Sequence, residues 1–215
     1  MRKTETRWWW IRHAPVIGSE GRFYGQTDLH ADCSDEPTFQ ALARVLPADA
    51  VLISSDMNRT TQTAAAIVDA GLGLPEAILD AALREQHLGD LQGRRRDEYA
   101  AERGRDLQRT WIAPAHERIP NGESFADLVE RAVEAIHRHT ADHAGRDIVC
   151  VAHGGTIRAA MSLALGLDPA TLDLERVFAF TVRNCSVTQL HHVRVDADDA
   201  DDAYWRIGKV NWLPA

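Results

Sequence analysis

Three short apolar runs, each ending at a polar residue, constrain the fold of this chain more than any other feature. The runs cover residues 8–11, 51–55 and 148–152. Apolar runs of this length predict strands of a parallel sheet that is buried on both faces. Polar side chains end the second run at Ser54-Ser55 and follow the other two runs at Arg12-His13 and His153. Because ligands bind outside the carboxyl ends of such strands, these residues are the first candidates for a functional site.

The rest of the chain alternates helical and strand patterns. We expect helices over residues 36–46, from 56 or 58 to about 70, over 123–143 and over 156–165, with further strands at 77–83, 177–182, 186–193 and 203–210. Asp56 or Asn58 can cap the second helix, and Ser124 with Asp127 forms a capping-box-like pair at the third. This order predicts a three-layer α/β/α sandwich with a mostly parallel central sheet.

Residues 89–122 show weak periodicity. They contain Arg94-Arg95-Arg96, Trp111, two prolines and His116. We interpret residues 90–122 as a small cap inserted into a single domain that spans residues 1–215, a length that suits one domain.

Charge and cysteine content narrow the functional class. The formal net charge of −8 argues against a broad surface for nucleic acid or an anionic membrane, so an anion site would be a local basic pocket. Three widely spaced cysteines give neither a metal motif nor a disulfide framework. The first apolar run is too short for a membrane span. We therefore expect a cytoplasmic protein without a metal or cofactor and without a nucleic-acid or membrane partner.

Neighbouring strands would bring His13, Arg59 and His153 to one place. Arg12 and Arg59 would then supply forked donors to phosphate oxygens, with His153 and the amides that follow it adding further donors. Phosphoryl transfer spreads charge over three equatorial oxygens, which is what such a donor set stabilises. The residues alone therefore indicate a phosphate site.

Five motifs in order resemble the histidine phosphatase superfamily, also called phosphoglycerate mutase-like. They are Arg12-His13 after a strand, the segment SSDMNRTTQTA from Ser54 to Ala64, the segment LREQHLG from Leu83 to Gly89, Gly122-Glu123-Ser124, and His153-Gly154-Gly155. A lone Arg-His pair would carry no information, whereas the ordered set is specific.

The resemblance implies a role for each matching residue. His13 would be the nucleophile that becomes a phosphohistidine, and Arg12, Arg59, His153 and Gly154 would bind the phosphate. Glu85 would protonate the leaving oxygen and then accept a proton from water. The expected function is metal-independent hydrolysis of a small phosphorylated metabolite.

The loop after the nucleophile departs from the family pattern. Ala14 and then Pro15 follow His13, where the family usually has glycine. With these residues, the Tyr24-Gly25-Gln26 loop most resembles small bacterial members of the α-ribazole phosphatase type. We expect Tyr24, Gly25 and Gln26, and in the cap Arg94, Trp111 and His116, to face the substrate.

Two other activities stay open. Phosphoglycerate mutases carry a longer insertion than positions 86 to 121, which are 36 residues here, so hydrolysis is favoured over mutase-type transfer. A pseudo-phosphatase that only binds a phosphorylated ligand is the third hypothesis, and a homodimer is possible for any of them.

Other polar clusters have simpler interpretations. His139 and His143 are four residues apart on a helix but have no evident third metal ligand. The acidic run at 196–202 lacks the glycine and distal glutamate of an EF-hand and is expected to be a solvated hairpin loop. Arg94-Arg95-Arg96 could bind a second phosphate or begin a solvated helix.

Overall fold

The computed structural model describes residues 2–104, 111–197 and 200–215 and contains a six-stranded sheet of order β3-β2-β4-β1-β5-β6. The strands are β1 (Arg2–Arg12), β2 (Val51–Ser54), β3 (Ile78–Leu79), β4 (Asp147–Ala152), β5 (Val187–Ala197) and β6 (Ala200–Trp212). β1, β2, β3 and β4 are parallel, whereas β5 runs antiparallel to β1 and to β6. The predicted three-layer α/β fold is confirmed.

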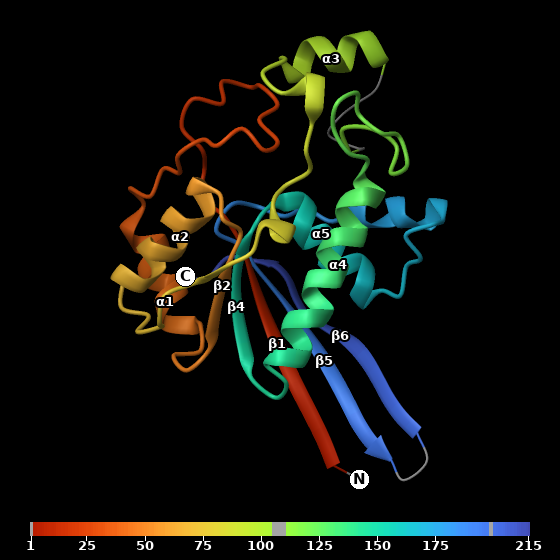
Figure 1. Ribbon diagram of the computed structural model, residues 1–215. Helices are drawn as coiled ribbons and strands as arrows, with labels where there is room; N and C mark the ends of the chain where they lie inside the picture. The colour runs from red at the N-terminus through yellow and green to blue at the C-terminus, as the bar shows by residue number, and fades with distance from the viewer. Residues whose placement is uncertain (1, 105–110, 198–199) are drawn as a thin grey trace.

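Helices cover both faces of this sheet (Figure 1). One face packs against α1 (Glu36–Val45) and α2 (Asn58–Asp69), and the other against α4 (Phe125–Asp142) and α5 (Gly154–Ala164). Alternation along β1 divides the two cores, because Trp8 and Trp10 face α4 and α5 while Ile11 faces α1 and α2. The two tryptophan rings stack with centroids 4.8 Å apart and are fully buried.

The cap lies beyond the carboxyl ends of β1, β2 and β4 (Figure 1). It contains the short 3-10 helix η2 (Gly89–Leu91) and α3 (Arg96–Arg103), and part of the predicted insertion, residues 105–110, falls outside the described ranges. Its own apolar cluster joins the loop after β1 to the cap through Phe23, Leu88, Leu91, Tyr99, Ala113 and Ile119. The cap therefore has a small core separate from those of the sheet.

Two predicted strands are wrong in whole or in part. Residues 172–179 form the 3-10 helix η3 (Leu172–Ala179), because Leu174 and Val177, three residues apart, both bury against α4 and α5. The strand expected at 77–83 is only β3, and the 3-10 helix η1 (Ala81–Leu83) follows it. The Asp80 carboxylate accepts a hydrogen bond from Ala82 N and so ends the strand.

Of the two predicted helix caps, one is confirmed and the other is wrong. The Ser124–Asp127 capping box of α4 is confirmed. The predicted cap of α2 is wrong: Met57 occupies that position without a side-chain bond. Asp56 instead pairs with Arg84, and Asn58 binds Asp28.

β1 is longer than its apolar run because β5 pairs with it as far as Arg2. The β5–β6 hairpin extends with it, and within the expected acidic loop Asp198 and Asp199 lie outside the described residues.

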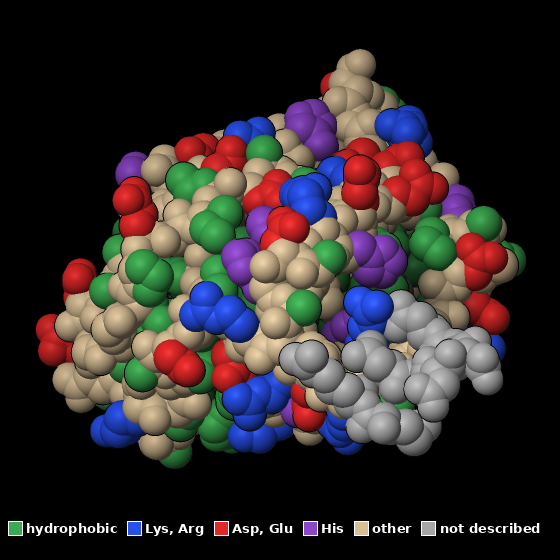
Figure 2. Space-filling view, turned by 60° about the horizontal axis from the view of Figure 1, so that its bottom comes forward, with side chains coloured by type: hydrophobic (Ala, Val, Ile, Leu, Met, Phe, Trp, Pro, Cys, Tyr) green, Lys and Arg blue, Asp and Glu red, His purple; other side chains and the backbone are tan. Residues whose placement is uncertain are grey.

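On the face in Figure 2, acidic and basic side chains are interspersed. No helix within the described ranges is long and apolar enough to cross a membrane.

Candidate active site

His13 and His153 meet at the carboxyl ends of two adjacent strands. His13 directly follows β1, His153 directly follows β4, and the last residues of these strands, Arg12 and Ala152, are in register. The two ring centroids are 5.3 Å apart. Both imidazoles are almost completely buried, with relative exposures of 1% and 0%. The structure thus brings together the two histidines that the sequence places 140 positions apart.

Arg59 enters the same site from the first turn of α2 and is fully buried. Its Nε donates to His153 Nδ1 at 3.2 Å, and its two Nη atoms donate to the carbonyls of Gly25 at 2.7 Å and Thr27 at 3.0 Å. These bonds hold the guanidinium in one orientation, so it is a fixed positive charge beside both imidazoles.

The hydrogen bonds assign opposite tautomers to the two histidines. His13 Nδ1 lies 2.6 Å from the Ala14 carbonyl, which can only accept, so this nitrogen carries the hydrogen and Nε2 keeps a lone pair. His153 Nδ1 accepts from Arg59, so its hydrogen lies on Nε2, which is buried and has no hydrogen-bond partner among the described residues. His13 therefore presents a nucleophilic atom and His153 a hydrogen-bond donor.

Burial and positive charge keep both imidazoles neutral. The pKa of His13 is well below its ordinary value, mainly through desolvation and then through Arg59 and Arg12. The pKa of His153 is lowered by the same causes, with desolvation again the largest. A neutral imidazole is the form that a histidine nucleophile requires.

Glu85 reaches the site from the segment after η1. Its carboxylate accepts hydrogen bonds from Gly155 N at 3.1 and 3.2 Å and from Gln86 N at 2.9 Å. A Cβ on Gly155 would lie 2.2 Å from Glu85 Oε1, so only glycine allows this approach. The first turn of α5, which begins directly after His153, thus holds the Glu85 carboxylate.

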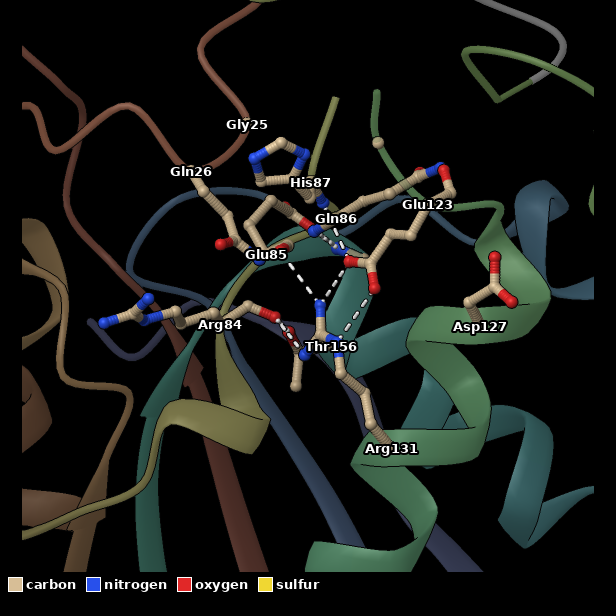
Figure 3. A network of polar contacts seen from close by, with 12 residues as sticks. Gly25, Gln26, Arg84, Glu85, Gln86, His87, Glu123, Asp127, Arg131 and Thr156 are labelled. Carbon is tan, nitrogen blue, oxygen red and sulfur yellow. Dashed lines mark hydrogen bonds and ion pairs between the residues drawn. The ribbon is translucent and has the colours of Figure 1, made fainter. Parts of the chain in front are cut away.

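A polar network behind Glu85 fixes its backbone (Figure 3). Arg131 of α4 donates to the carbonyls of Ala82 at 2.8 Å, Arg84 at 2.9 Å and Glu85 at 3.0 Å. The same guanidinium pairs with Glu123 at 2.5 Å, and Glu123 accepts from His87 N at 2.8 Å. This explains the Gly122-Glu123-Ser124 motif, whose glutamate supports the segment that carries Glu85.

A cavity of about 230 Å³ is lined by three of the candidate residues, Arg12, Glu85 and Gly154. His13, Arg59 and His153 are not among its lining residues, and aromatic and apolar side chains form much of the rest of the lining. The lining residues are Arg12, Phe23, Tyr24, Gly25, Glu85, Gln86, Leu88, Arg96, Trp111, Ile112, Gly154, Arg158 and Phe178.

Residues expected to face the substrate fall into two groups. Tyr24, Gly25 and Trp111 line the cavity. Gln26 does not line it, but its Nε2 donates to the Glu85 carbonyl at 2.9 Å. Arg94 and His116 are not among the lining residues. Arg94 pairs with Glu102 at 2.7 Å, and His116 Nε2 lies 3.1 Å from the Thr171 carbonyl.

The other polar clusters are accounted for by local contacts. His139 Nε2 lies 2.8 Å from Asp80 Oδ2 and stacks on His143 with centroids 6.2 Å apart. Within the described ranges, no three His, Cys, Asp or Glu side chains gather as metal ligands. Of the three consecutive arginines, Arg95 pairs with Asp97 at 2.5 Å, and Arg96 begins α3.

Sequence reasoning missed Arg158 and Phe178 in the cavity wall, whereas Arg96, considered there as part of the basic run, does line the cavity. Arg158 lies four residues after Gly154 on α5, so helical periodicity could have placed it on the same face. Asn184 was also missed; its Nδ2 donates to the His13 carbonyl at 2.7 Å. Ala14, the departure from the family pattern, is fully buried, and its N donates to Thr63 Oγ1 at 2.9 Å.

A family model described as the histidine phosphatase superfamily (branch 1) matches residues 8–198. A glucosyl-3-phosphoglycerate phosphatase from Mycolicibacterium vanbaalenii is 36% identical over 213 residues, covering 92% of this chain and 90% of the relative. A 2,3-bisphosphoglycerate-dependent phosphoglycerate mutase from Gloeobacter violaceus is 31% identical over 170 residues, covering 76% and 77%.

Solved structures agree with the fold. A mycobacterial glucosyl-3-phosphoglycerate phosphatase in complex with VO3 has a TM-score of 0.76 at 27% identity, covering 95% of this chain and 98% of that one. A putative α-ribazole-5'-P phosphatase from Escherichia coli has a TM-score of 0.74 at 19% identity, covering 97% of each chain, and so shares the fold. The proteins to which this chain is similar thus include some named as phosphatases and some named as mutases.

Proposed function

Because the chain belongs to the histidine phosphatase superfamily, we propose that it is a metal-independent phosphomonoesterase that acts on a small phosphorylated metabolite. The observation that carries the proposal is the opposite tautomers of two adjacent buried histidines, with Arg59 fixed beside them. One imidazole offers a lone pair, and the other offers a hydrogen-bond donor that has no partner in the described part of the chain.

In the first step, His13 Nε2 attacks phosphorus and the ester P–O bond breaks. Glu85, as the carboxylic acid, gives its proton to the leaving oxygen. Arg12, Arg59, His153 Nε2–H and the amide of Gly154 hold the three equatorial oxygens. The products are a phosphohistidine and a free alcohol.

In the second step, water attacks phosphorus, the P–N bond breaks and the Glu85 carboxylate accepts the water proton. This restores neutral His13 and protonated Glu85, so the cycle balances. One carboxyl group can serve both half-reactions because proton transfer runs in opposite directions in them.

Mutase-type transfer is the second candidate, and the Gloeobacter relative named as a mutase supports it. In that reaction the phosphohistidine would return its phosphoryl group to the substrate rather than to water. Incubation with 3-phosphoglycerate separates the two, since isomerisation indicates a mutase and free phosphate a phosphatase.

The first test is phosphate release from p-nitrophenyl phosphate in EDTA by the wild type and by His13→Ala. We expect steady release by the wild type and a loss of at least about a thousandfold in the variant, as for other deleted nucleophiles. Quenching turnover with alkaline detergent, in which the P–N bond of a phosphohistidine is stable, should trap phosphate on the wild-type protein and none on the variant.

Activity that survives in the variant would assign the nucleophile elsewhere. A folded wild type that binds inorganic phosphate but releases none from any ester would point to the binding-only alternative.

A further inference from the structure

The main chain at His13 is held by side chains from two distant parts of the sequence. His13 and Ala14 share one peptide group, whose carbonyl and N–H point to opposite sides because the group is planar and trans. Asn184 Nδ2 donates to the His13 carbonyl at 2.7 Å, and Ala14 N donates to Thr63 Oγ1 at 2.9 Å. Both polar ends of this peptide group are therefore fixed by side chains.

Thr63 offers its hydroxyl in one direction only. It lies on the buried face of α2, and its Oγ1 donates to the Arg59 carbonyl one turn earlier at 2.7 Å. Because the hydroxyl hydrogen is used there, a lone pair is left for the Ala14 N–H. Thr63 and Ala14 are both fully buried, so loss of the hydroxyl would leave this N–H without water or another acceptor in its place.

Asn184 is directed at His13 by a turn with an unfavourable backbone conformation. The turn covers residues 183–186, and a backbone hydrogen bond of 3.1 Å between its ends closes it. Within it, Cys185 has a φ of +57°, in the left-handed region that favours glycine. Its N also donates to the Arg12 carbonyl at 2.9 Å. Backbone of this kind persists where the surrounding structure holds it and is common at active sites, which points to a role for this turn.

The fixed peptide group limits where the next carbonyl, that of Ala14, points. Holding the group restricts φ of Ala14, and Pro15 restricts ψ of Ala14 to extended values. With both dihedral angles limited, the Ala14 carbonyl stays 2.6 Å from His13 Nδ1. The Ala14-Pro15 pair, which departs from the family pattern, thus gives a more rigid acceptor than glycine would.

The direction of this carbonyl matters because a neutral imidazole has two tautomers. The bond made by one ring nitrogen decides which nitrogen carries the hydrogen. The Ala14 carbonyl can only accept, so it keeps the hydrogen on His13 Nδ1. If the carbonyl turned away, the hydrogen could reside on Nε2 instead, and the lone pair that attacks phosphorus in the proposed first step would be lost.

We propose that Asn184 and Thr63 are positioning residues, which hold the His13–Ala14 peptide group and so keep the lone pair of His13 on Nε2. This inference rests on the proposed phosphatase function and adds two residues to its machinery. Neither side chain is among the lining residues of the cavity, so both act through the Ala14 carbonyl rather than on the substrate.

The tautomer itself can be measured by ¹⁵N NMR of the histidine side chains, with His13 assigned by its absence in His13→Asn. A ring nitrogen that carries a hydrogen and one that does not differ widely in ¹⁵N shift. In the wild type we expect the hydrogen on Nδ1. In T63V and in N184A a large share should move to Nε2, whereas T63S, which keeps the hydroxyl, should resemble the wild type.

Single-turnover kinetics with p-nitrophenyl phosphate measure the consequence for catalysis. Phosphohistidine formation should slow by about tenfold in T63V and in N184A, the scale of one lost hydrogen bond, with little change in the half-saturating substrate concentration. T63S should recover most of the rate. The double variant should lose much less than the product of the two single losses, because either change already releases the same peptide group.

T61V is the matched control. Thr61 lies on the same helix but lines a separate groove beside β3, and its hydroxyl donates to the Asn58 carbonyl at 3.0 Å. The change should leave both the His13 tautomer and the rate as in the wild type. Should T63V fail to fold, N184A carries both measurements.

An unchanged tautomer in N184A and T63V would overturn the proposal even if their rates fall, since a purely structural role lowers stability or activity without moving the hydrogen. Absence of hydrolysis of any ester by the folded wild type would instead overturn the proposed function. The NMR comparison needs no turnover, so it would still decide whether these two residues set the tautomer.

Discussion

His13 and His153 differ in role because their Nδ1 atoms face different partners. A backbone carbonyl accepts from one, and the Arg59 guanidinium donates to the other. Arg59 thus sets the tautomer of His153 and, through its charge, lowers the pKa of both rings. The same buried arginine orients the donor and, after desolvation as the larger cause, helps to keep the His13 imidazole neutral.

The lowered pKa of His13 predicts a loss of stability in acid. Its pKa in the folded state is below the unfolded value of about 6.5, so its contribution is complete above pH 6.5 and is lost as pH falls toward the folded pKa. The free energy of unfolding should fall by up to about 1.4 kcal/mol per pH unit for this residue. Urea unfolding from pH 7.5 to 5, compared with His13→Asn, measures it.

The variant should show a shallower decline than the wild type below pH 6.5. Exposed histidines contribute equally to both proteins and cancel in the comparison. Identical slopes would mean that His13 titrates normally in the folded protein.

At the scale of elements, α4 supports Glu85, the carboxylate of the proposed active site, although no residue of α4 is among the described residues that line the cavity. Arg131 of this helix donates hydrogen bonds to three backbone carbonyls of the segment 82–85. It also forms an ion pair with Glu123. The segment has no strand or long helix of its own, so these bonds take the place of regular structure. Arg131 is therefore a positioning residue for Glu85.

Replacing Arg131 with methionine should lower kcat by about a hundredfold through displacement of Glu85, with a much smaller change in KM. Unfolding free energy should fall by about 2–3 kcal/mol, since several backbone acceptors lose a charged donor. Steady-state kinetics with p-nitrophenyl phosphate and urea unfolding measure both effects.

R118M is the control, because Arg118 pairs with Asp127 of α4 at the surface, where its side chain is 64% exposed. It should change stability by no more than about 0.5 kcal/mol and leave kcat unchanged. Partial rescue of kcat by R131K is expected; a purely structural loss, with stability reduced and kcat kept, would contradict the positioning role.

At the scale of the whole molecule, the sheet and the cap are stabilised separately. Two large clusters bury the central strands, and the cap depends on the smaller cluster around Phe23 and Tyr99. The cavity lies between them and takes residues from both. In the proposed phosphatase, substrate recognition would therefore depend partly on the less extensively packed part of the fold.

Hydrogen exchange should resolve these two parts. Amides of β4 should be the slowest to exchange. Those of η2 and α3 in the cap should exchange through local opening, which requires a much smaller free energy than global unfolding. Inorganic phosphate should slow exchange at Gly154 and Gly155 and in the loop near Gly25, whose carbonyl fixes Arg59. Equal protection of cap and β4 without ligand would contradict the separation.

The sequence by itself determined the layers, the central strands, the main helices and the family. These features depend on local patterns. Apolar runs, helical periodicity and the capping box of α4 can each be recognised from a short stretch of sequence. The ordered motifs also identified His13, Arg59, Glu85 and His153, which the structure places around one site or, for Glu85, in its cavity.

Only the tertiary structure decided which cap residues face the cavity and which arginines have partners. Arg94 and Arg96 are two positions apart in the same basic run, yet one pairs with Glu102 and the other lines the cavity. Residues 177–182 look like a strand in the sequence, but long-range packing of Leu174 and Val177 makes a 3-10 helix that ends at Ala179. Such outcomes depend on contacts between segments that are distant in the sequence. A local sequence pattern does not predict those contacts.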